Sequence, residues 1–283
     1  GDCVLVTGSG DKRVRVWQWR SGTGYIEAYF SPLQGHKYGV TSVKVSPRST
    51  MLASASIDGT TLLWNLRTGS KIHTMVQVGG EAVRVCRFSP DSTLLATAGD
   101  NGQVCLWDLN SGKVMTIVSG HNRYVACCAF SRDGNLLATG SNDKSVIVWD
   151  LKGNRLCSIF RGHSDAVNAI AFTPDSCYLV TACNEGTWRL FDIVDNKNCA
   201  ALIIHGGNVT CVRFSPIHSE ILGSVATDRT ARIWSIYSGV CLYVLEEHES
   251  LVTACAFSED TSLFITEISI DDTEIPHEFL CPI

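Results

Sequence analysis

The clearest candidates for chemistry in this sequence are hydroxyl, imidazole and acidic side chains that recur together. A Ser or Thr stands four residues before an acid, a Trp or Phe follows that acid by six, and a His lies upstream. Serine, histidine and aspartate together could form the triad of a hydrolase. The sets are His36, Ser54, Asp58 and Trp64; His121, Thr139, Asp143 and Trp149; His163, Thr181, Glu185 and Phe191; and His205, Ser224, Asp228 and Trp234.

The number of copies argues against catalysis. A nucleophile needs one cleft, one oxyanion hole and one substrate pose, so equivalent copies along a chain suit architecture better. In a structural network the acid accepts a hydrogen bond from His, His contacts the hydroxyl, and the hydroxyl accepts from the indole N–H. Each such bond involving a charge contributes roughly 1.5 to 3 kcal/mol. We therefore predict a structural network, with no catalytic residue, metal ion or cofactor.

Two units depart from this pattern. Gly79 and Asn101 stand where His and the acid are expected in the third unit, and Phe191 replaces the Trp in the fifth, where Glu185 is a longer acid. Without these partners the networks should be incomplete. We predict that these two units are the least rigid.

The elements that position these residues repeat about every 42 residues. Each unit holds four short alternating runs separated by turn formers, such as VACCAF, LLATGS, SVIVWD and RLCSIF between residues 125 and 160. This pattern predicts a four-stranded antiparallel sheet. One sheet cannot bury both of its faces alone, so the units must stack, and radial stacking predicts a β-propeller.

The repeat resembles the WD40 family, which carries Gly-His near the start of each unit and Trp-Asp near its end. GHNRYV at 120–125 with VWD at 148–150 fits closely, as does GHSDAV at 162–167 with LFD at 190–192. The resemblance implies an all-β WD40 β-propeller over residues 1–266. Counting strands predicts seven blades, the first and last incomplete in this chain. In the alternative, VTACAF at 252–257 completes the N-terminal sheet and closes a six-bladed ring.

The resemblance also implies a partner-binding top face, formed by residues that flank each strand-opening Val or precede each turn acid. The second unit places Gly39, Thr41 and Ile57 there. A polar face of this kind suits a protein or peptide partner, with Tyr124 and Arg84 as anchors because Tyr and Arg dominate binding hot spots. The predicted partner-binding residues of the later units are Arg84, Asp100, Tyr124, Asn142, Asn168, Asn184, Asn208 and Thr210.

The C-terminal segment changes character. An acidic linker at 267–274 leads into EIPHEFLCPI, of which residues 275–283 resemble the opening of a U-box. Together with the repeats, this makes the chain similar to the WD-repeat, SAM and U-box proteins. That resemblance implies the substrate-receptor part of a U-box ubiquitin ligase, with Ile283 at a position that touches the ubiquitin-conjugating enzyme. The other interpretation is an ordinary chain terminus, because nine residues cannot fold into a U-box and no SAM-like segment precedes them.

Composition excludes several classes of function. The 283 residues carry a net charge of −5 without a basic tail or stripe, which disfavours nucleic-acid binding. Apolar runs are far shorter than the roughly 20 residues of a membrane span, and no secretory signal is visible, so we expect no membrane partner. Thirteen cysteines without a CxxC motif indicate reduced, mostly buried thiols. We therefore expect a cytoplasmic protein, with the nucleus as a second location.

Overall fold

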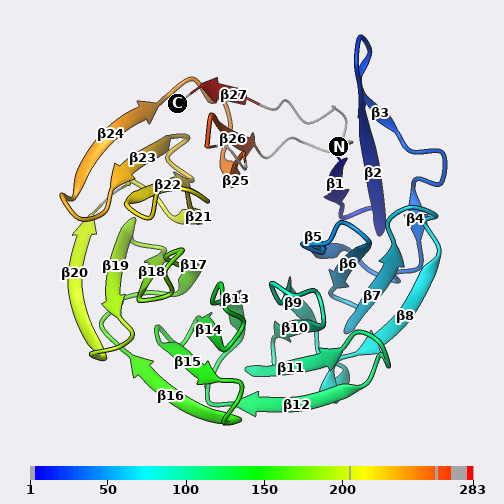
Figure 1. Ribbon diagram of the computed structural model, residues 1–283, viewed down its shortest axis with the longest axis horizontal. Coiled ribbons are helices and arrows are strands. Elements are labelled where there is room, and N and C mark those ends of the chain that lie inside the picture. Colours follow the sequence, from blue (N-terminus) through cyan, green and yellow to red (C-terminus); the bar gives the residue numbers. More distant parts are fainter. Residues whose placement is uncertain (1–3, 204, 259–260, 269–278, 283) are drawn as a thin grey trace. The chain divides into compact units, whose positions relative to one another are not determined.

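The computed structural model describes residues 4–203, 205–258, 261–268 and 279–282, and nearly all of its regular structure is β-strand (Figure 1). The chain divides into two compact units, residues 1–125 and 126–283. Each unit is a series of small antiparallel sheets whose strands lie side by side in chain order.

The first unit contains three sheets. The strands of the first sheet are β1 (Val4–Gly8), β2 (Arg13–Arg20), β3 (Gly24–Glu27) and β4 (Leu33–Gln34). The second sheet comprises β5 (Val40–Val45), β6 (Met51–Ser56), β7 (Thr60–Asn65) and β8 (Lys71–Val76). A 3₁₀ turn, η1 (Val78–Gly80), leads into the third sheet, which comprises β9 (Val83–Phe88), β10 (Leu94–Gly99), β11 (Gln103–Asp108) and β12 (Val114–Ser119).

The second unit continues the series. The fourth sheet comprises β13 (Val125–Phe130), β14 (Leu136–Ser141), β15 (Val146–Asp150) and β16 (Arg155–Phe160), and the fifth β17 (Val167–Phe172), β18 (Tyr178–Cys183), β19 (Thr187–Asp192) and β20 (Lys197–Ile203). The sixth comprises β21 (Val209–Phe214), β22 (Ile221–Ala226), β23 (Ala231–Ser235) and β24 (Val240–Leu245). The last comprises β25 (Val252–Phe257), β26 (Leu263–Ile268) and β27 (Phe279–Pro282).

The first and last sheets differ from the rest in connectivity. Both β3 and β4 pair with β2, at Trp17–Arg20 and at Arg13–Val14, so together they act as one interrupted outer strand. The last sheet has three strands within the described residues. Its third strand, β27, belongs to the segment predicted as a U-box opening, and Phe279 of this strand pairs with Thr266 of β26. Residues 275–278 and Ile283 lie outside the described residues.

Burial along the strands follows the sequence pattern. The second and third strands of a sheet, such as β6 and β7, are buried at most positions because sheets cover both of their faces, as expected for stacked sheets. The fourth strand is the exposed edge, and in β8 only Met75 is fully buried. The sequence run LLATGS and its equivalents are therefore continuous apolar or small-residue runs, whereas the edge strands mix polar and apolar residues.

Tight turns join the second and third strands. In the fifth sheet this turn contains Gly186, whose φ is +72°. A Cβ added there would lie 2.2 Å from the carbonyl oxygen of His205, so only glycine fits this close approach without a backbone shift. The turn thereby brings the loop ahead of the sixth sheet against the fifth sheet.

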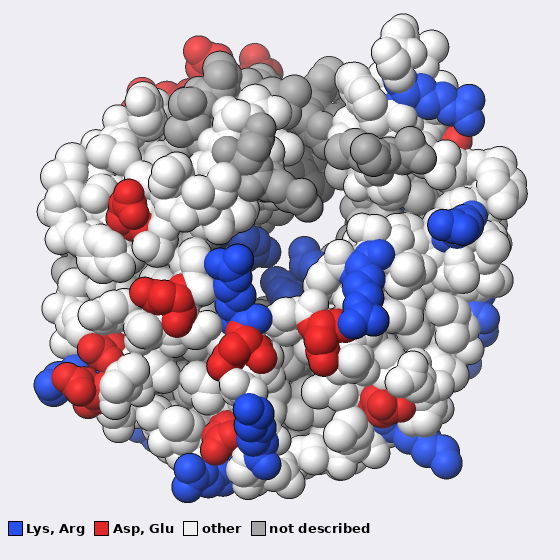
Figure 2. All heavy atoms as spheres, in the orientation of Figure 1, with Lys and Arg blue, Asp and Glu red and all other residues white. Residues whose placement is uncertain are grey.

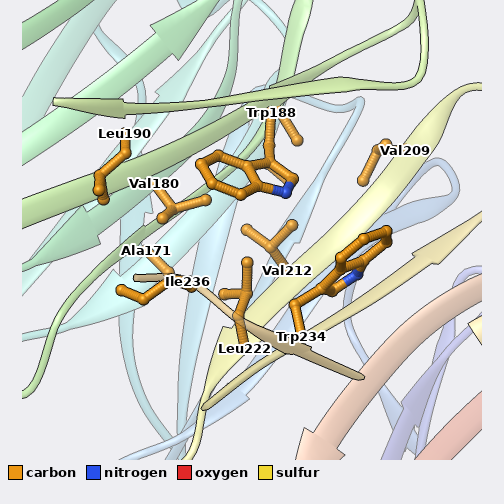
Figure 3. Packing of buried hydrophobic residues seen from close by; sticks show 11 residues of the cluster. Ala171, Val180, Trp188, Leu190, Val209, Val212, Leu222, Trp234 and Ile236 are labelled. Atoms are coloured by element: carbon orange, nitrogen blue, oxygen red, sulfur yellow. The ribbon is translucent and has the colours of Figure 1, made fainter. Parts of the chain in front are cut away.

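The hydrophobic core lies between successive sheets. Figure 3 shows one such layer in the second unit, where Trp188 and Val180 of the fifth sheet face Val212, Leu222 and Trp234 of the sixth. All five side chains are at most 4% exposed. Burial of such side chains stabilises the fold by about 1.5 to 3 kcal/mol each, so the stacked sheets depend on one another for their stability.

Candidate functional site

The sixth sheet contains the complete network. Nδ1 of His205 lies 3.0 Å from Asp228 Oδ2, and its Nε2 lies 2.8 Å from Ser224 Oγ. The indole N–H of Trp234 donates to the same hydroxyl at 2.9 Å. Thr230 and the backbone N–H of Gly206 also donate to the Asp228 carboxylate.

The protonation of this network follows from its surroundings. Burial lowers the pKa of His205, although Asp228 opposes the change. Burial would raise the pKa of Asp228, but His205 and the hydrogen bond from Thr230 hold it below its usual value. A neutral imidazole therefore donates from Nδ1 to a carboxylate, and its Nε2 accepts from the Ser224 hydroxyl. Each of these polar groups has a partner.

The second sheet repeats the arrangement. Nδ1 of His36 lies 3.2 Å from Asp58 and its Nε2 2.8 Å from Ser54 Oγ, which accepts from Trp64 Nε1 at 2.9 Å. The hydroxyls of Ser54 and Ser224 belong to residues with no exposed surface. A hydroxyl enclosed in this way and shared between imidazole and indole cannot reach a substrate, so the geometry is that of a packing element.

The fourth sheet shows part of the network within the second unit. Trp149 Nε1 donates to Thr139 Oγ1 at 3.1 Å, and Asp143 accepts from the hydroxyl and the backbone N–H of Ser145. His121, which belongs to the first unit, is 8% exposed.

In the fifth sheet, the prediction that Glu185 is the acid of the network is wrong. His163 Nε2 lies 2.7 Å from Thr181 Oγ1, but Glu185 contacts Ser164 instead of the imidazole. Nδ1 of His163 is buried and has no partner among the described residues. Burial and the positive charge of Arg189 lower the pKa of His163 to about 4. The extra methylene of Glu185 carries its carboxylate past the imidazole, so the predicted acid is absent from this network.

The prediction that the third sheet has an incomplete network is wrong. Gln77 is 2% exposed and its amide oxygen accepts from Thr97 Oγ1 at 2.8 Å. Trp107 Nε1 donates to that same hydroxyl at 2.8 Å. The Gln77 amide therefore replaces imidazole, and Asn101 donates to the carbonyl of Val78. Only the polar residue two positions before Gly79 signals this substitution in the sequence.

The last sheet contains a hydrogen bond that the sequence analysis missed. Nε2 of His248 lies 3.1 Å from Oγ1 of Thr266, and both residues are buried. The signal was available, because Thr266 follows His248 by the same 18 residues that separate His36 from Ser54.

Three predicted partner-binding residues meet in the first unit. Arg84 Nε donates to Asp100 Oδ1 at 2.6 Å and its Nη2 to Oδ2 at 3.1 Å, which is a two-bond ion pair. The Arg84 guanidinium lies over the Tyr124 ring, 5.5 Å from its centroid. These side chains are half-buried or exposed, so a surface cluster of charge and aromatic ring results.

Asp100 and Tyr124 belong to a continuous series of loops, here called the rim loops: residues 9–12, 36–40, 56–59, 78–82, 99–102 and 120–124. Arg84 lies in β9, just after the loop at 78–82. Neighbouring loops contact through their backbones. The N–H of Val40 donates to Ser9, that of Ile57 to Gly39, and that of Asp100 to Ala82. A Cβ on Gly59 would lie 2.4 Å from the carbonyl oxygen of Gly80. A Cβ on Gly102 would lie 3.0 Å from the carbonyl oxygen of Arg123. The rim loops therefore form one connected surface.

The rim loops expose an aromatic and an aliphatic side chain. Tyr38 is 61% exposed and Ile57 51%. Lys12 Nζ lies 6.0 Å from the centroid of the Tyr38 ring. The predicted position Ile57 is thus accessible, whereas Tyr38 and Lys12 were missed because they fall outside the positions that the resemblance implies. Thr41 is engaged, since its hydroxyl donates to Val83 at 2.6 Å.

The predicted residues of the second unit are used within the fold. Asn168 donates to Asn184, and Thr210 donates to the carbonyl of Val252 at 2.6 Å. The backbone N–H of Asn208 donates to Thr227 Oγ1, while Asn142 is half-buried. Side-chain hydrogen bonds therefore occupy Asn168, Asn184 and Thr210, in contrast to the aromatic and charged cluster of the first unit.

Metal sites, membrane spans and thiols are the remaining features of the described residues. No group of three or more His, Cys, Asp or Glu in the described ranges is arranged to hold a metal ion. In that part of the chain no helix has the length and apolar character of a membrane span. Eleven cysteines in the described part are free thiols, seven of them buried.

Comparison with known proteins identifies the repeat. WD repeat, SAM and U-box domain-containing protein 1 of Homo sapiens is 42% identical over 82 residues, 29% of this chain and 17% of the relative. Its counterpart in Danio rerio is 40% identical over 85 residues, 30% and 17% of the two chains. Small ribosomal subunit protein RACK1y of Oryza sativa subsp. japonica is 36% identical over 72 residues, 25% and 20%.

The matches to the first two relatives span less than a fifth of those proteins. The resemblance to the WD-repeat, SAM and U-box proteins is confirmed over these 82 to 85 residues of the repeat array. A family model described as the first beta-propeller of IFT122 matches residues 2–275, nearly the whole chain. The predicted all-β fold and WD40 repeat are thus confirmed, and this chain belongs to the family of the IFT122 first beta-propeller.

Proposed function

We propose that this protein is a non-catalytic interaction scaffold that binds a protein or peptide partner through the rim loops of its first unit. The observation that carries the proposal is the Arg84, Asp100 and Tyr124 cluster. Tyr and Arg are enriched at binding hot spots, and loops on a rigid scaffold are the usual place for recognition.

The geometry of Arg84 suits contact with a peptide. Its Nε and Nη2 are held by Asp100, while no hydrogen bond from Nη1 to another described residue accompanies that pair. The ion pair and the Tyr124 ring hold the guanidinium in one orientation. A partner carbonyl could accept from Nη1 with little further loss of side-chain entropy, which favours binding.

The test is selection of peptides from a random library displayed on phage, using the whole chain as bait. Replacing Arg84 and Tyr124 together by Ala should weaken binding of the selected peptides by about tenfold or more. Met115→Ala is the control, because Met115 is 60% exposed on the edge strand β12. Equal binding by the double variant and the wild type would refute the proposal, provided that both unfold at the same denaturant concentration.

A second candidate function is the substrate-receptor part of a U-box ubiquitin ligase. It is favoured by the matches to proteins whose names include a U-box, and by residues 275–283. A U-box beyond Ile283 would recruit the ubiquitin-conjugating enzyme, while the propeller holds the substrate. Ubiquitin conjugates should form when a longer natural chain is mixed with activating and conjugating enzymes. Residues 1–283 alone should form none.

We also propose the finer architecture and the location. The interrupted outer strand of the first sheet and the three strands of the last favour a seven-bladed propeller whose first and last blades are incomplete in this chain. Free, mostly buried thiols favour a reducing compartment such as the cytoplasm. Native mass spectrometry of the natural protein and imaging of a tagged chain test these two points.

A further inference from the structure

We infer that the rim loops recognise an acidic peptide segment, with carboxylates beside Lys12 and Lys37 and an apolar side chain against Tyr38 and Ile57. The inference rests on the proposed function and adds the chemistry of the partner. It starts from two exposed lysines, neither of which forms an ion pair with any described residue.

Three acids of the rim loops already have partners. Asp58 has a side chain only 4% exposed and accepts from the backbone N–H of Lys37 and from Thr60. Asp11 forms an ion pair with Arg15 at 2.7 Å, and Asp100 is held by Arg84. Glu81 is the exposed acid of the loop at 78–82. The loops at 9–12 and 36–40 thus present positive charge that nearby carboxylates leave uncompensated.

An apolar contact lies next to this charge. Lys12 stands against the exposed Tyr38 ring, and the Ile57 side chain lies close to Gly39, where an added Cβ would come within 3.9 Å of Ile57 Cδ1. An added Cβ there would also lie 3.4 Å from Gly10 Cα, so the Ile57 side chain lies beside the backbone of the residue that follows Tyr38. A partner side chain of Leu or Phe size could cover both, while its neighbouring carboxylates approach the two lysines.

The charge distribution favours a peptide over other polyanions. On the face shown in Figure 2, acidic and basic side chains are interspersed, without a continuous field of either sign. The whole chain carries a net charge of −5. A nucleic acid or an anionic membrane needs an extended basic surface, whereas two lysines beside an apolar contact match a short acidic segment.

The experiment measures fluorescence anisotropy of a labelled heptapeptide, Gly-Glu-Asp-Leu-Asp-Glu-Gly, with the whole chain. We expect saturable binding that weakens as salt rises, and little binding of the isosteric Gly-Gln-Asn-Leu-Asn-Gln-Gly. Changing both Lys12 and Lys37 to Glu should reduce affinity for the acidic probe at least about tenfold. Ile57→Asp should reduce it as well.

The matched control is Lys113→Glu. Lys113 is also exposed and belongs to the same unit, but it follows the opposite end of β11 from the rim. This variant should keep wild-type affinity, and all variants should unfold at similar denaturant concentrations because the changed side chains are exposed.

The inference would be overturned by equal affinity for the acidic and neutral probes, by no effect of the double lysine variant, or by tighter binding to oligothymidylate or to phosphatidylserine vesicles. Library peptides that depend on Arg84 and Tyr124 but carry no acidic residues would leave the scaffold function standing and refute only this inference.

Discussion

The fifth and sixth sheets have the same strand order and nearly the same length, yet their internal polar networks differ. In the sixth, His205 is held by Asp228 on one side and Ser224 on the other, and Trp234 completes the set. In the fifth, the His163 ring keeps only its hydrogen bond to Thr181 among the described residues. The comparison shows that the sheet does not require the full network.

Apolar packing accompanies the incomplete network. Phe191 stacks on Phe160 with ring centroids 4.5 Å apart, and it is 1% exposed. The ring fills the space of an indole without needing an acceptor for an N–H. Conversely, Nδ1 of His163 and Nε of Arg189 are buried without partners among the described residues, which costs about 1 to 3 kcal/mol per group. Unpaired polar groups therefore lower the stability of the fifth sheet more than that of the sixth.

The largest difference in stability between the two sheets should appear when the hydroxyl at the centre of each network is removed. Ser224→Ala removes a group that serves both His205 and Trp234, and we expect a loss of about 2 to 4 kcal/mol in the free energy of unfolding. Thr181→Val removes one contact only and should cost about 1 to 2 kcal/mol. Urea unfolding measures both. A greater cost for Thr181→Val would reverse the comparison.

The next largest difference in stability should appear when Asp228 of the sixth sheet and Glu185 of the fifth are replaced. Asp228→Ala leaves the buried His205 without its carboxylate and should cost about 2 to 3 kcal/mol. Glu185→Ala loses a surface contact with Ser164 and should change stability by less than about 0.5 kcal/mol. The same urea series provides the values. Similar costs for the two variants would mean that Glu185 does support its sheet.

Burial lowers the pKa of both imidazoles, but a carboxylate opposes the change only at His205, while Arg189 adds to it at His163. The native pKa of His163 is about 4, whereas unfolded His titrates near 6.5. The unfolded state therefore binds more protons between these values, and stability should fall as pH drops from about 6.5 to 4, by at most about 1.4 kcal/mol per pH unit. His163→Gln should flatten this slope in urea unfolding measured across pH. An unchanged slope would contradict the assignment.

The smallest expected difference between the two sheets is in how often their strands open locally to solvent. Amides of β18 and β19 should exchange with solvent several-fold faster than those of β22 and β23, because the fifth sheet has fewer satisfied polar groups. The third sheet should not share this weakness, since Gln77 restores its network. Hydrogen exchange read by mass spectrometry tests both statements. Slower exchange in the fifth sheet than in the sixth would disprove the first.

Much of the fold was predictable because its signals are local. Alternation, turn residues and a fixed period are properties of short segments, and they predicted the strands of each sheet. The networks of His36 and His205 were predictable for the same reason, since they repeat at fixed spacing. The role of Gln77 was not predictable, because Gln77 lies two residues before the position where His is expected. The 3₁₀ turn η1 that follows it lets its amide reach Thr97.

The candidate site was predictable only in part. Arg84 lies in β9 while Asp100 and Tyr124 lie in two separate loops, and the resemblance placed all three on one face. Their mutual contact depends on the rotamers and loop backbones of two sheets. Tyr38 and Lys12 were missed because neither occupies a position that the resemblance implies, and only the packing of two rim loops brings them together.

The sequence by itself determined a WD40 propeller of repeated sheets, because hydrophobic periodicity and turn chemistry act over a few residues. Tertiary structure alone decided which polar groups meet: Glu185 bonds Ser164 and misses His163, while Arg84 bridges Asp100 and Tyr124. The physical reason is that these contacts depend on the exact distance between two polar groups. A hydrogen bond or a stacked cation is lost within about an ångström, and such distances are set by how whole sheets pack, not by residue types in one segment.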